Sequence, residues 1–247
     1  MSDIRNRSAR ARSFETVATD YERHRPEYPR EAIDWAGSEL GLGAGARVVD
    51  VGAGTGKLTR GLVAAGFSVA AVEPGAAMLD ELRTAVPEAE AFEAPAEQIP
   101  LRDESCDAVF AAQAFHWFNR ELALAEFQRV LRPGGGLALV WNWWDERDPL
   151  QAELGPVIGY AGHVPYREEE LPGTPWFEEV GRTVVDAVTD SSPDALVAML
   201  STTSRYLLEE PAERERSLRE VHAIASRYGE QFAWPQLTYV FAYRRID

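Results

Sequence analysis

The 247-residue chain contains one cysteine, one lysine and no long uninterrupted run of apolar residues. The single cysteine, Cys106, excludes an intrachain disulfide. A membrane-spanning helix needs about 20 consecutive apolar residues, and no segment approaches that length. These absences predict a soluble protein of a reducing, cytoplasmic compartment, without a membrane partner.

Positive charge is also scarce, because 25 Lys and Arg stand against 40 Asp and Glu, for a net charge of −15. A surface of that sign repels nucleic-acid phosphates, so no nucleic-acid partner is expected unless a basic partner supplies the phosphate contacts. His24, His163 and His222 show no metal-ligand spacing with one another or with Cys106, so no metal is expected. The sequence does not indicate an oligomeric state.

The hydrophobic fraction of 45% and the length suffice for one large core. From Ala46 onward, short β-branched runs alternate with helical patterns, as is typical of parallel strands joined by crossover helices in a doubly wound α/β fold. Strands are expected at 47–51, 67–72, 90–92, 107–112, 137–141, 182–188 and 236–244. Helices are expected at 30–40, 149–160, 193–200 and 211–227. A further helix is expected between the glycine-rich turn and Gly66, where Leu58, Leu62 and Ala65 have helical spacing. Another begins at Pro74 and includes Met78, Leu79 and Leu82, and another is capped by Asn119 and extends to Leu131.

A glycine-rich turn, Gly52, Gly54 and Gly56, separates the first strand from its helix. Three residues without side chains allow a ligand to contact the main chain, and the following helix N-terminus offers free N–H groups. This pattern favours an adenosine-type cofactor. The dinucleotide motif G-x-G-x-x-G has its third glycine one position later, which disfavours an NAD-dependent oxidoreductase. Gly56 and Lys57 match the end of a P-loop, but Val51 and Leu58 replace its first glycine and its Ser or Thr, which disfavours a nucleoside triphosphatase.

Glu73 lies at the end of the second expected strand, 23 positions after Asp50. A carboxylate there can accept hydrogen bonds from both hydroxyls of a ribose. Each such bond contributes about 1.5–3 kcal/mol, which predicts that Glu73 strengthens cofactor binding roughly ten- to hundredfold. The alternative is that Glu73 only favours the dipole of the next helix.

The segment Val48-Val49-Asp50-Val51-Gly52-Ala53-Gly54-Thr55-Gly56, together with Glu73, resembles motif I and the acidic strand-two residue of class I S-adenosylmethionine-dependent methyltransferases. Residues 94–100 resemble the adenine-covering segment, 107–118 the strand-four motif and 131–135 the turn before strand five. Residues 114–118 and the lead-in 14–29 are similar to the type 11 small-molecule group, including trans-aconitate methyltransferase-like proteins. The resemblance implies a Rossmann-like, seven-stranded, mostly parallel sheet with an antiparallel last strand.

The same resemblance implies that S-adenosylmethionine binds over the carboxyl ends of strands one to four. The cofactor-binding residues that it implies are Tyr21, Asp50, Gly52, Ala53, Gly54, Gly56, Glu73, Ala96, Glu97 and Gln113. The adenine segment departs from the family pattern in one respect. An acidic residue often precedes the small residue of this segment in the family, whereas this chain has Ala94 and Ala96 there.

His116 follows the fourth strand and is the candidate catalytic residue. It has three interpretations: a general base, a hydrogen-bonding group that positions the substrate, or a structural residue. The candidate substrate-binding residues are Arg25, Tyr28, Phe115, Trp117, Asn142 and Trp143. We therefore expect methyl transfer from S-adenosylmethionine to a small organic acceptor. The alternatives are an NAD-dependent oxidoreductase and a non-catalytic, cofactor-binding partner subunit.

Residues 1–29 are expected to form an N-terminal arm, disordered over 2–13, and a lid. Residues 30–247 are expected to form the methyltransferase domain, with helical cap segments at about 143–175 and 193–230.

Overall fold

The computed structural model describes residues 14–159 and 175–246 of the chain. The segment 2–13, which is expected to be disordered, and residues 160–174 of the first expected cap segment lie outside the described residues.

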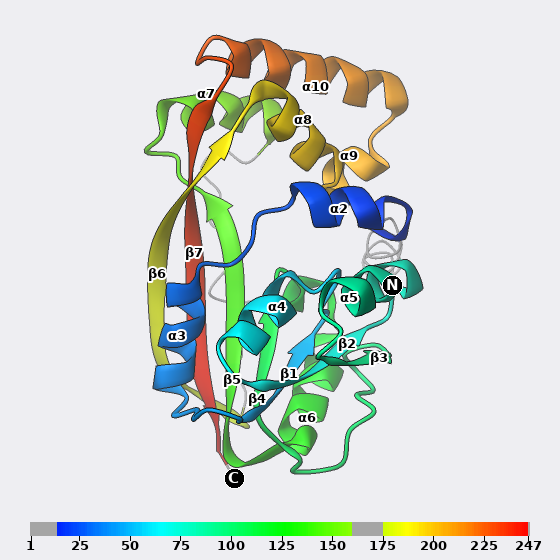
Figure 1. The fold of residues 1–247 in the computed structure, drawn as a ribbon, viewed down its shortest axis with the longest axis vertical. Helices are drawn as coiled ribbons and strands as arrows, with labels where there is room; N and C mark the ends of the chain where they lie inside the picture. Colours follow the sequence, from blue (N-terminus) through cyan, green and yellow to red (C-terminus); the bar gives the residue numbers. More distant parts are fainter. Residues whose placement is uncertain (1–13, 160–174, 247) are drawn as a thin grey trace. The chain divides into compact units, whose positions relative to one another are not determined.

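The described residues form a seven-stranded sheet with the order β3-β2-β1-β4-β5-β7-β6 (Figure 1). The first five strands pair in parallel, and the sheet ends in antiparallel last strands, which confirms the predicted Rossmann-like fold. The strands are β1 (Arg47–Val51), β2 (Ser68–Glu73), β3 (Glu90–Glu93), β4 (Cys106–Ala112), β5 (Leu131–Trp144), β6 (Phe177–Ser191) and β7 (Phe232–Arg245).

The expected helices are present, and the structure adds some that the sequence pattern did not reveal. The lead-in is itself helical, and α9 is too short for its periodicity to be detected. The elements are η1 (Phe14–Val17), α2 (Ala18–His24), α3 (Arg30–Glu39), α4 (Lys57–Ala64), α5 (Ala76–Ala85), η2 (Phe115–Trp117), α6 (Arg120–Val130), α7 (Pro149–Ile158), α8 (Pro193–Ser201), α9 (Ser204–Leu208) and α10 (Pro211–Ser226). No helix among the described residues is long and apolar enough to cross a membrane.

Successive residues of the central strands point to opposite faces of the sheet, and both faces are covered. Val48, Phe110 and Val140 pack with α3 and α4 on one face. Val109 and Leu139 pack with α6 on the other face. The apolar runs of these strands therefore reflect burial on both faces. Because β1 to β4 pair in parallel, their carboxyl ends lie at the same edge of the sheet.

The start of β5 differs from the prediction. The segment 132–135 was expected to be a turn before a strand at 137, but β5 begins at Leu131, directly after α6. Leu131 pairs with Cys106 and Gly136 pairs with Ala108, so the intervening residues form an irregularity within the strand. Gly134 permits it by adopting a φ of +71°.

The chain divides into two compact units. Among the described residues, the sheet unit comprises 26–142, 175–185 and 238–246, and the helical unit comprises 14–25, 143–159 and 186–237. The helical unit has its own apolar core, formed by residues such as Leu154, Leu200 and Tyr206. Most of the expected cap segments belong to this unit, and their role as a cap stays a prediction.

Candidate functional site

The glycine-rich turn lies between β1 and α4, and each of its three glycines has a positive φ, of +69° at Gly52, +56° at Gly54 and +90° at Gly56. A Cβ atom on Gly52 would lie 2.5 Å from the Cβ atom of Ala114, so this glycine is required for close packing. A Cβ atom on Gly54 would meet no atom within 4 Å. The main chain at Gly54 therefore borders open space that a ligand can enter.

Glu73 ends β2 beside this turn and is half-buried. Its Oε2 atom accepts a hydrogen bond from the Gly54 N–H (2.9 Å), and its Oε1 atom accepts one from the Gly75 N–H (2.8 Å). Gly75 is the N-cap of α5, so the carboxylate also favours the N-terminus of that helix. Both interpretations of Glu73 thus fit one carboxylate, because a carboxylate can accept more than two hydrogen bonds.

Asp50, in β1, is 1% exposed. Its Oδ2 atom accepts a hydrogen bond from Thr59 Oγ1 (2.6 Å), and its Oδ1 atom has no hydrogen-bond partner among the described residues. Burial raises the pKa of Asp50 to about 7; the Thr59 hydrogen bond opposes this shift and the charge of Glu73 adds to it. The buried hydroxyl of Thr55 likewise has no partner within the described part of the chain. Buried polar atoms are normally paired, so these two fit a polar ligand.

The expected adenine segment follows β3. Ala96 is buried, and the Glu97 carboxylate accepts a hydrogen bond from the Asn119 N–H (2.6 Å) at the start of α6. The Asn119 side chain in turn accepts from the Leu122 N–H and caps that helix, as expected. Glu97 therefore attaches this segment to the N-terminus of α6.

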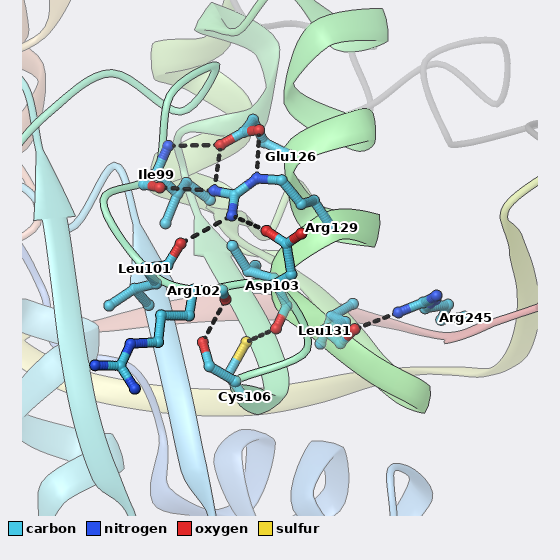
Figure 2. A network of polar contacts seen from close by, with 11 residues as sticks. Ile99, Leu101, Arg102, Asp103, Cys106, Glu126, Arg129, Leu131 and Arg245 are labelled. Atoms are coloured by element: carbon cyan, nitrogen blue, oxygen red, sulfur yellow. Dashed lines mark hydrogen bonds and ion pairs between the residues drawn. The ribbon is translucent and has the colours of Figure 1, made fainter.

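Arg129 of α6 attaches the downstream end of the same loop (Figure 2). Its guanidinium donates two hydrogen bonds to Glu126 (both 2.8 Å) and one to Asp103 (2.7 Å). It also donates to the carbonyl oxygens of Leu101 (2.8 Å) and Ile99 (2.7 Å). All five guanidinium N–H groups are thus used. The hydrogen bonds from Arg129 lower the pKa of Glu126, whose Oε2 atom also accepts from the Ile99 N–H.

Gln113 follows β4 and has a φ of +52°, a backbone conformation that is strained for a residue with a side chain. Its Nε2 atom donates to the carbonyl oxygen of Asn142 (2.5 Å). The Asn142 side chain accepts from Thr238 Oγ1 (2.7 Å) and donates to the Glu27 carbonyl oxygen (3.2 Å). Asn142, in β5, is therefore hydrogen-bonded to β7 and to the lead-in. Its expected contact with a substrate stays a prediction.

Glu27 was not singled out from the sequence, yet it connects the lead-in to α4. Its carboxylate forms ion pairs with Lys57 Nζ (3.0 Å) and Arg60 (2.5 Å). Lys57, the only lysine of the chain, is 9% exposed and directly follows the glycine-rich turn. The isolated lysine was the one signal that the sequence offered for this contact.

The short helix η2 orients the aromatic residues that follow β4. Phe115 and Phe118 are 3% and 9% exposed and belong to the core, with their rings in edge-to-face contact. Phe115 therefore packs into the core instead of lining an open pocket, because the turn of η2 directs it inward. His116 is exposed and Trp117 is half-buried, and their ring centroids are 4.4 Å apart.

The remaining expected site residues have local roles in the structure. Arg25 lies 5.1 Å over the Tyr21 ring and donates to the Thr202 hydroxyl and carbonyl oxygens, all within the helical unit. Tyr28 packs against the sheet-unit core beside α3 and α4. Trp143 is half-buried. Contacts of these four residues with a cofactor or substrate stay predictions.

Comparisons with known proteins agree with the fold. A family model described as a methyltransferase domain matches residues 49–139. An uncharacterized methyltransferase of Mycobacterium tuberculosis is 45% identical over 217 residues, which cover 87% of this chain and 86% of the relative. A malonyl-[acyl-carrier protein] O-methyltransferase of Pseudescherichia vulneris is 31% identical over 242 residues, 94% of this chain and 91% of the relative. A solved structure from Anaeromyxobacter dehalogenans, described as a type II methyltransferase, is 28% identical, covers 89% of this chain and 97% of that chain, and has a TM-score of 0.69.

The fold, the glycine-rich turn and the acidic end of β2 define a class I S-adenosylmethionine-dependent methyltransferase. The chain belongs to the methyltransferase domain family whose model matches residues 49–139. This assignment decides against the NAD-dependent oxidoreductase.

Proposed function

We propose that the protein transfers the methyl group of S-adenosylmethionine to a small organic acceptor. The observation that carries this proposal is the arrangement at the carboxyl ends of β1 and β2. Open main chain at Gly54 lies next to the Glu73 carboxylate, and Asp50 adds a buried oxygen atom without a partner among the described residues.

These residues fit the cofactor. Glu73 would accept hydrogen bonds from the ribose hydroxyls, and the main chain of 52–56 would bind the amino-acid tail. Ala96 and Glu97, on the loop attached to α6, would contact the adenine. When bound, the cofactor supplies a methyl group activated by attachment to a positively charged sulfur.

Positioning is the main task of the chain's own residues. Holding two reactants in the correct geometry contributes about 7–11 kcal/mol, whereas a general base contributes about 3–5 kcal/mol. The rigid attachments of Gln113, Asn142 and Arg129 serve this purpose. His116 is exposed just beyond the carboxyl end of β4, where it would accept a proton from the acceptor or hold it by a hydrogen bond.

Small carboxylic acids are the first acceptors to examine. The segments 114–118 and 14–29 resemble those of trans-aconitate methyltransferase-like proteins, and the P. vulneris relative is named as a malonyl-[acyl-carrier protein] O-methyltransferase. Both comparisons support methylation of a carboxylate oxygen. Because a carboxylate is already ionised at neutral pH, His116 would hold such an acceptor by a hydrogen bond, and the role of a base applies to phenol or amine acceptors.

Calorimetric titration with S-adenosylhomocysteine tests the cofactor proposal. The wild-type protein should bind it and should not bind NADH. Glu73→Gln should weaken binding at least roughly tenfold, because a charged acceptor is lost. Glu90→Gln, a change at the opposite end of the neighbouring strand β3, is the matched control and should bind like the wild type. Binding of NADH in place of S-adenosylhomocysteine would overturn the proposal.

A radiolabelled methyl-transfer assay with a panel of carboxylic acids, phenols and amines tests the reaction. His116→Ala should lower turnover roughly 10²–10⁴-fold if His116 is the base, with little change in cofactor affinity. His222→Ala, which alters an exposed histidine of α10, serves as the control. Cofactor binding without a methylated product from any member of the panel would favour a non-catalytic partner subunit.

A further inference from the structure

Strand β6 is the last strand in the sheet order, so within the described residues it forms an edge of the sheet (Figure 1). It is also long, running from Phe177 to Ser191. An edge strand offers one row of N–H and C=O groups to a further strand, and proteins normally keep such edges short or interrupted. A long edge strand is therefore a surface at which strand pairing between chains can occur.

One face of β6 carries a row of exposed valines. Val180, Val184 and Val188 are 38%, 47% and 65% exposed, and residues four positions apart lie on the same face of a strand. The opposite face is packed, because Val185 is 6% exposed and a Cβ atom on Gly181 would lie 3.3 Å from the Trp35 ring. Three of the exposed large apolar side chains thus gather on a single strand face, which indicates an interaction surface.

The charges between these valines are self-complementary. Arg182 and Asp186 flank Val184 symmetrically on the same face, and both are exposed. If two copies pair antiparallel about Val184, each Arg182 lies opposite Asp186 of the second copy, and each Val180 lies opposite Val188. Opposite charges and β-branched residues are favourable cross-strand pairs.

The neighbouring antiparallel registers match less well. A shift by two residues places both Arg182 and Asp186 opposite valines. A shift by four residues places Arg182 opposite Arg182 in one direction; in the other it places Asp186 opposite Asp186, although Arg182 then lies opposite Asp190. In the register centred on Val184, like charges meet only at the ends, where Glu178 lies opposite Asp190 and solvent screens the repulsion.

The charged residues also have partners within their own chain. Arg182 pairs with Glu179 at 2.7 Å, and Asp186 pairs with Arg147 at 2.6 Å. A carboxylate accepts several hydrogen bonds and a guanidinium donates five, so a second copy adds to these pairs without replacing them. The Arg182 guanidinium also lies 5.6 Å over the Phe241 ring of β7.

We propose that two copies of this chain pair through antiparallel β6 strands, with the two-fold axis at Val184, to join their sheets into one. Such an interface is isologous, because the same strand serves both subunits. It is independent of the cofactor site, so S-adenosylhomocysteine binding reports separately on the proposed function.

Oxidative crosslinking tests the register. Val184→Cys should form a disulfide-linked dimer, because a residue on the axis lies about 4.5–5.5 Å from its own copy, within disulfide range. Val188→Cys should crosslink much less, because it lies opposite Val180. The native Cys106 is 2% exposed and gives no background. Equal crosslinking of the two variants would overturn the register and with it the proposal.

Charge reversal tests the pairing itself. In sedimentation experiments the wild type should dimerise, and Arg182→Asp or Asp186→Arg should each weaken the dimer at least roughly tenfold. The double variant should regain most of the affinity, because each reversed charge then meets its complement. Circular dichroism confirms that every variant is folded. A wild-type monomer up to the solubility limit, or a double variant weaker than both single variants, would refute the proposal.

Discussion

The buried carboxyl group of Asp50 makes the stability of the protein depend on pH in an unusual direction. Its pKa is about 7 in the folded chain, against an ordinary value of 3.8. The folded state therefore binds a proton that the unfolded state releases, and the free energy of unfolding falls as the pH rises from about 4 to about 7. Each pKa unit corresponds to 1.36 kcal/mol, so the total loss attributable to this group is about 4 kcal/mol.

Asp50→Asn removes this contribution. The amide is neutral at every pH, and its oxygen atom can still accept the hydrogen bond from Thr59. The difference in unfolding free energy between the variant and the wild type should therefore change by about 4 kcal/mol between pH 4 and pH 8, in favour of the variant at pH 8. A constant offset from the new amide N–H groups does not affect this slope.

Urea denaturation at several pH values between 4 and 8 measures the difference directly. Asp80→Asn, which alters an exposed carboxylate paired with Arg83, is the matched control and should follow the wild type at every pH. If the curves of Asp50→Asn and the wild type run parallel, Asp50 is ionised in the folded protein and the reasoning from its burial is wrong.

Two further sets of variants test the turn and the loop. Gly52→Ala should destabilise the protein by about 1–3 kcal/mol in thermal unfolding, because its Cβ atom would collide with Ala114. Both positions have a positive φ that strains an alanine, but a Cβ atom on Gly54 would enter open space, so Gly54→Ala should destabilise the protein less than Gly52→Ala and should lower cofactor affinity; equal stability losses for the two glycine variants would contradict this. Arg129→Met should cost about 2–3 kcal/mol and accelerate hydrogen exchange at the amides of Ile99 and Leu101, whereas Arg102→Met should do neither. Unchanged hydrogen exchange in Arg129→Met would show that the loop does not depend on the Arg129 hydrogen bonds for its stability.

Much of the sheet could be predicted because its signals are local. Apolar runs bounded by glycine or proline predicted β1 and β2, a continuous apolar run predicted β4, and Asn119 predicted the start of α6. The helix α9 could not be found, since five residues do not complete two turns. The start of β5 was missed because Pro133 and Gly134 are typical of turns, and only the pairing of Leu131 with Cys106 extends the strand through them.

The site divides in the same way. The glycine-rich turn and Glu73 are sequence-local, and the structure brings them into hydrogen-bond contact. Glu27 forms an ion pair with Lys57, and Arg129 donates to the carbonyl oxygen of Ile99. In both cases the partner is 30 positions away in the sequence, so no local sequence motif predicts the contact. The sequence marks Phe115 and His116 as neighbours but does not show that η2 directs them to different sides, with Phe115 buried and His116 exposed. Contact of Phe115 with a substrate stays a prediction.

A crystal structure with bound S-adenosylhomocysteine is the most direct test of the account. It should show the ribose hydroxyls within hydrogen-bond distance of the Glu73 carboxylate and the amino-acid tail along the main chain of residues 52–56. A ligand bound elsewhere, with the space beside Gly54 filled by protein side chains, would contradict the proposed cofactor site.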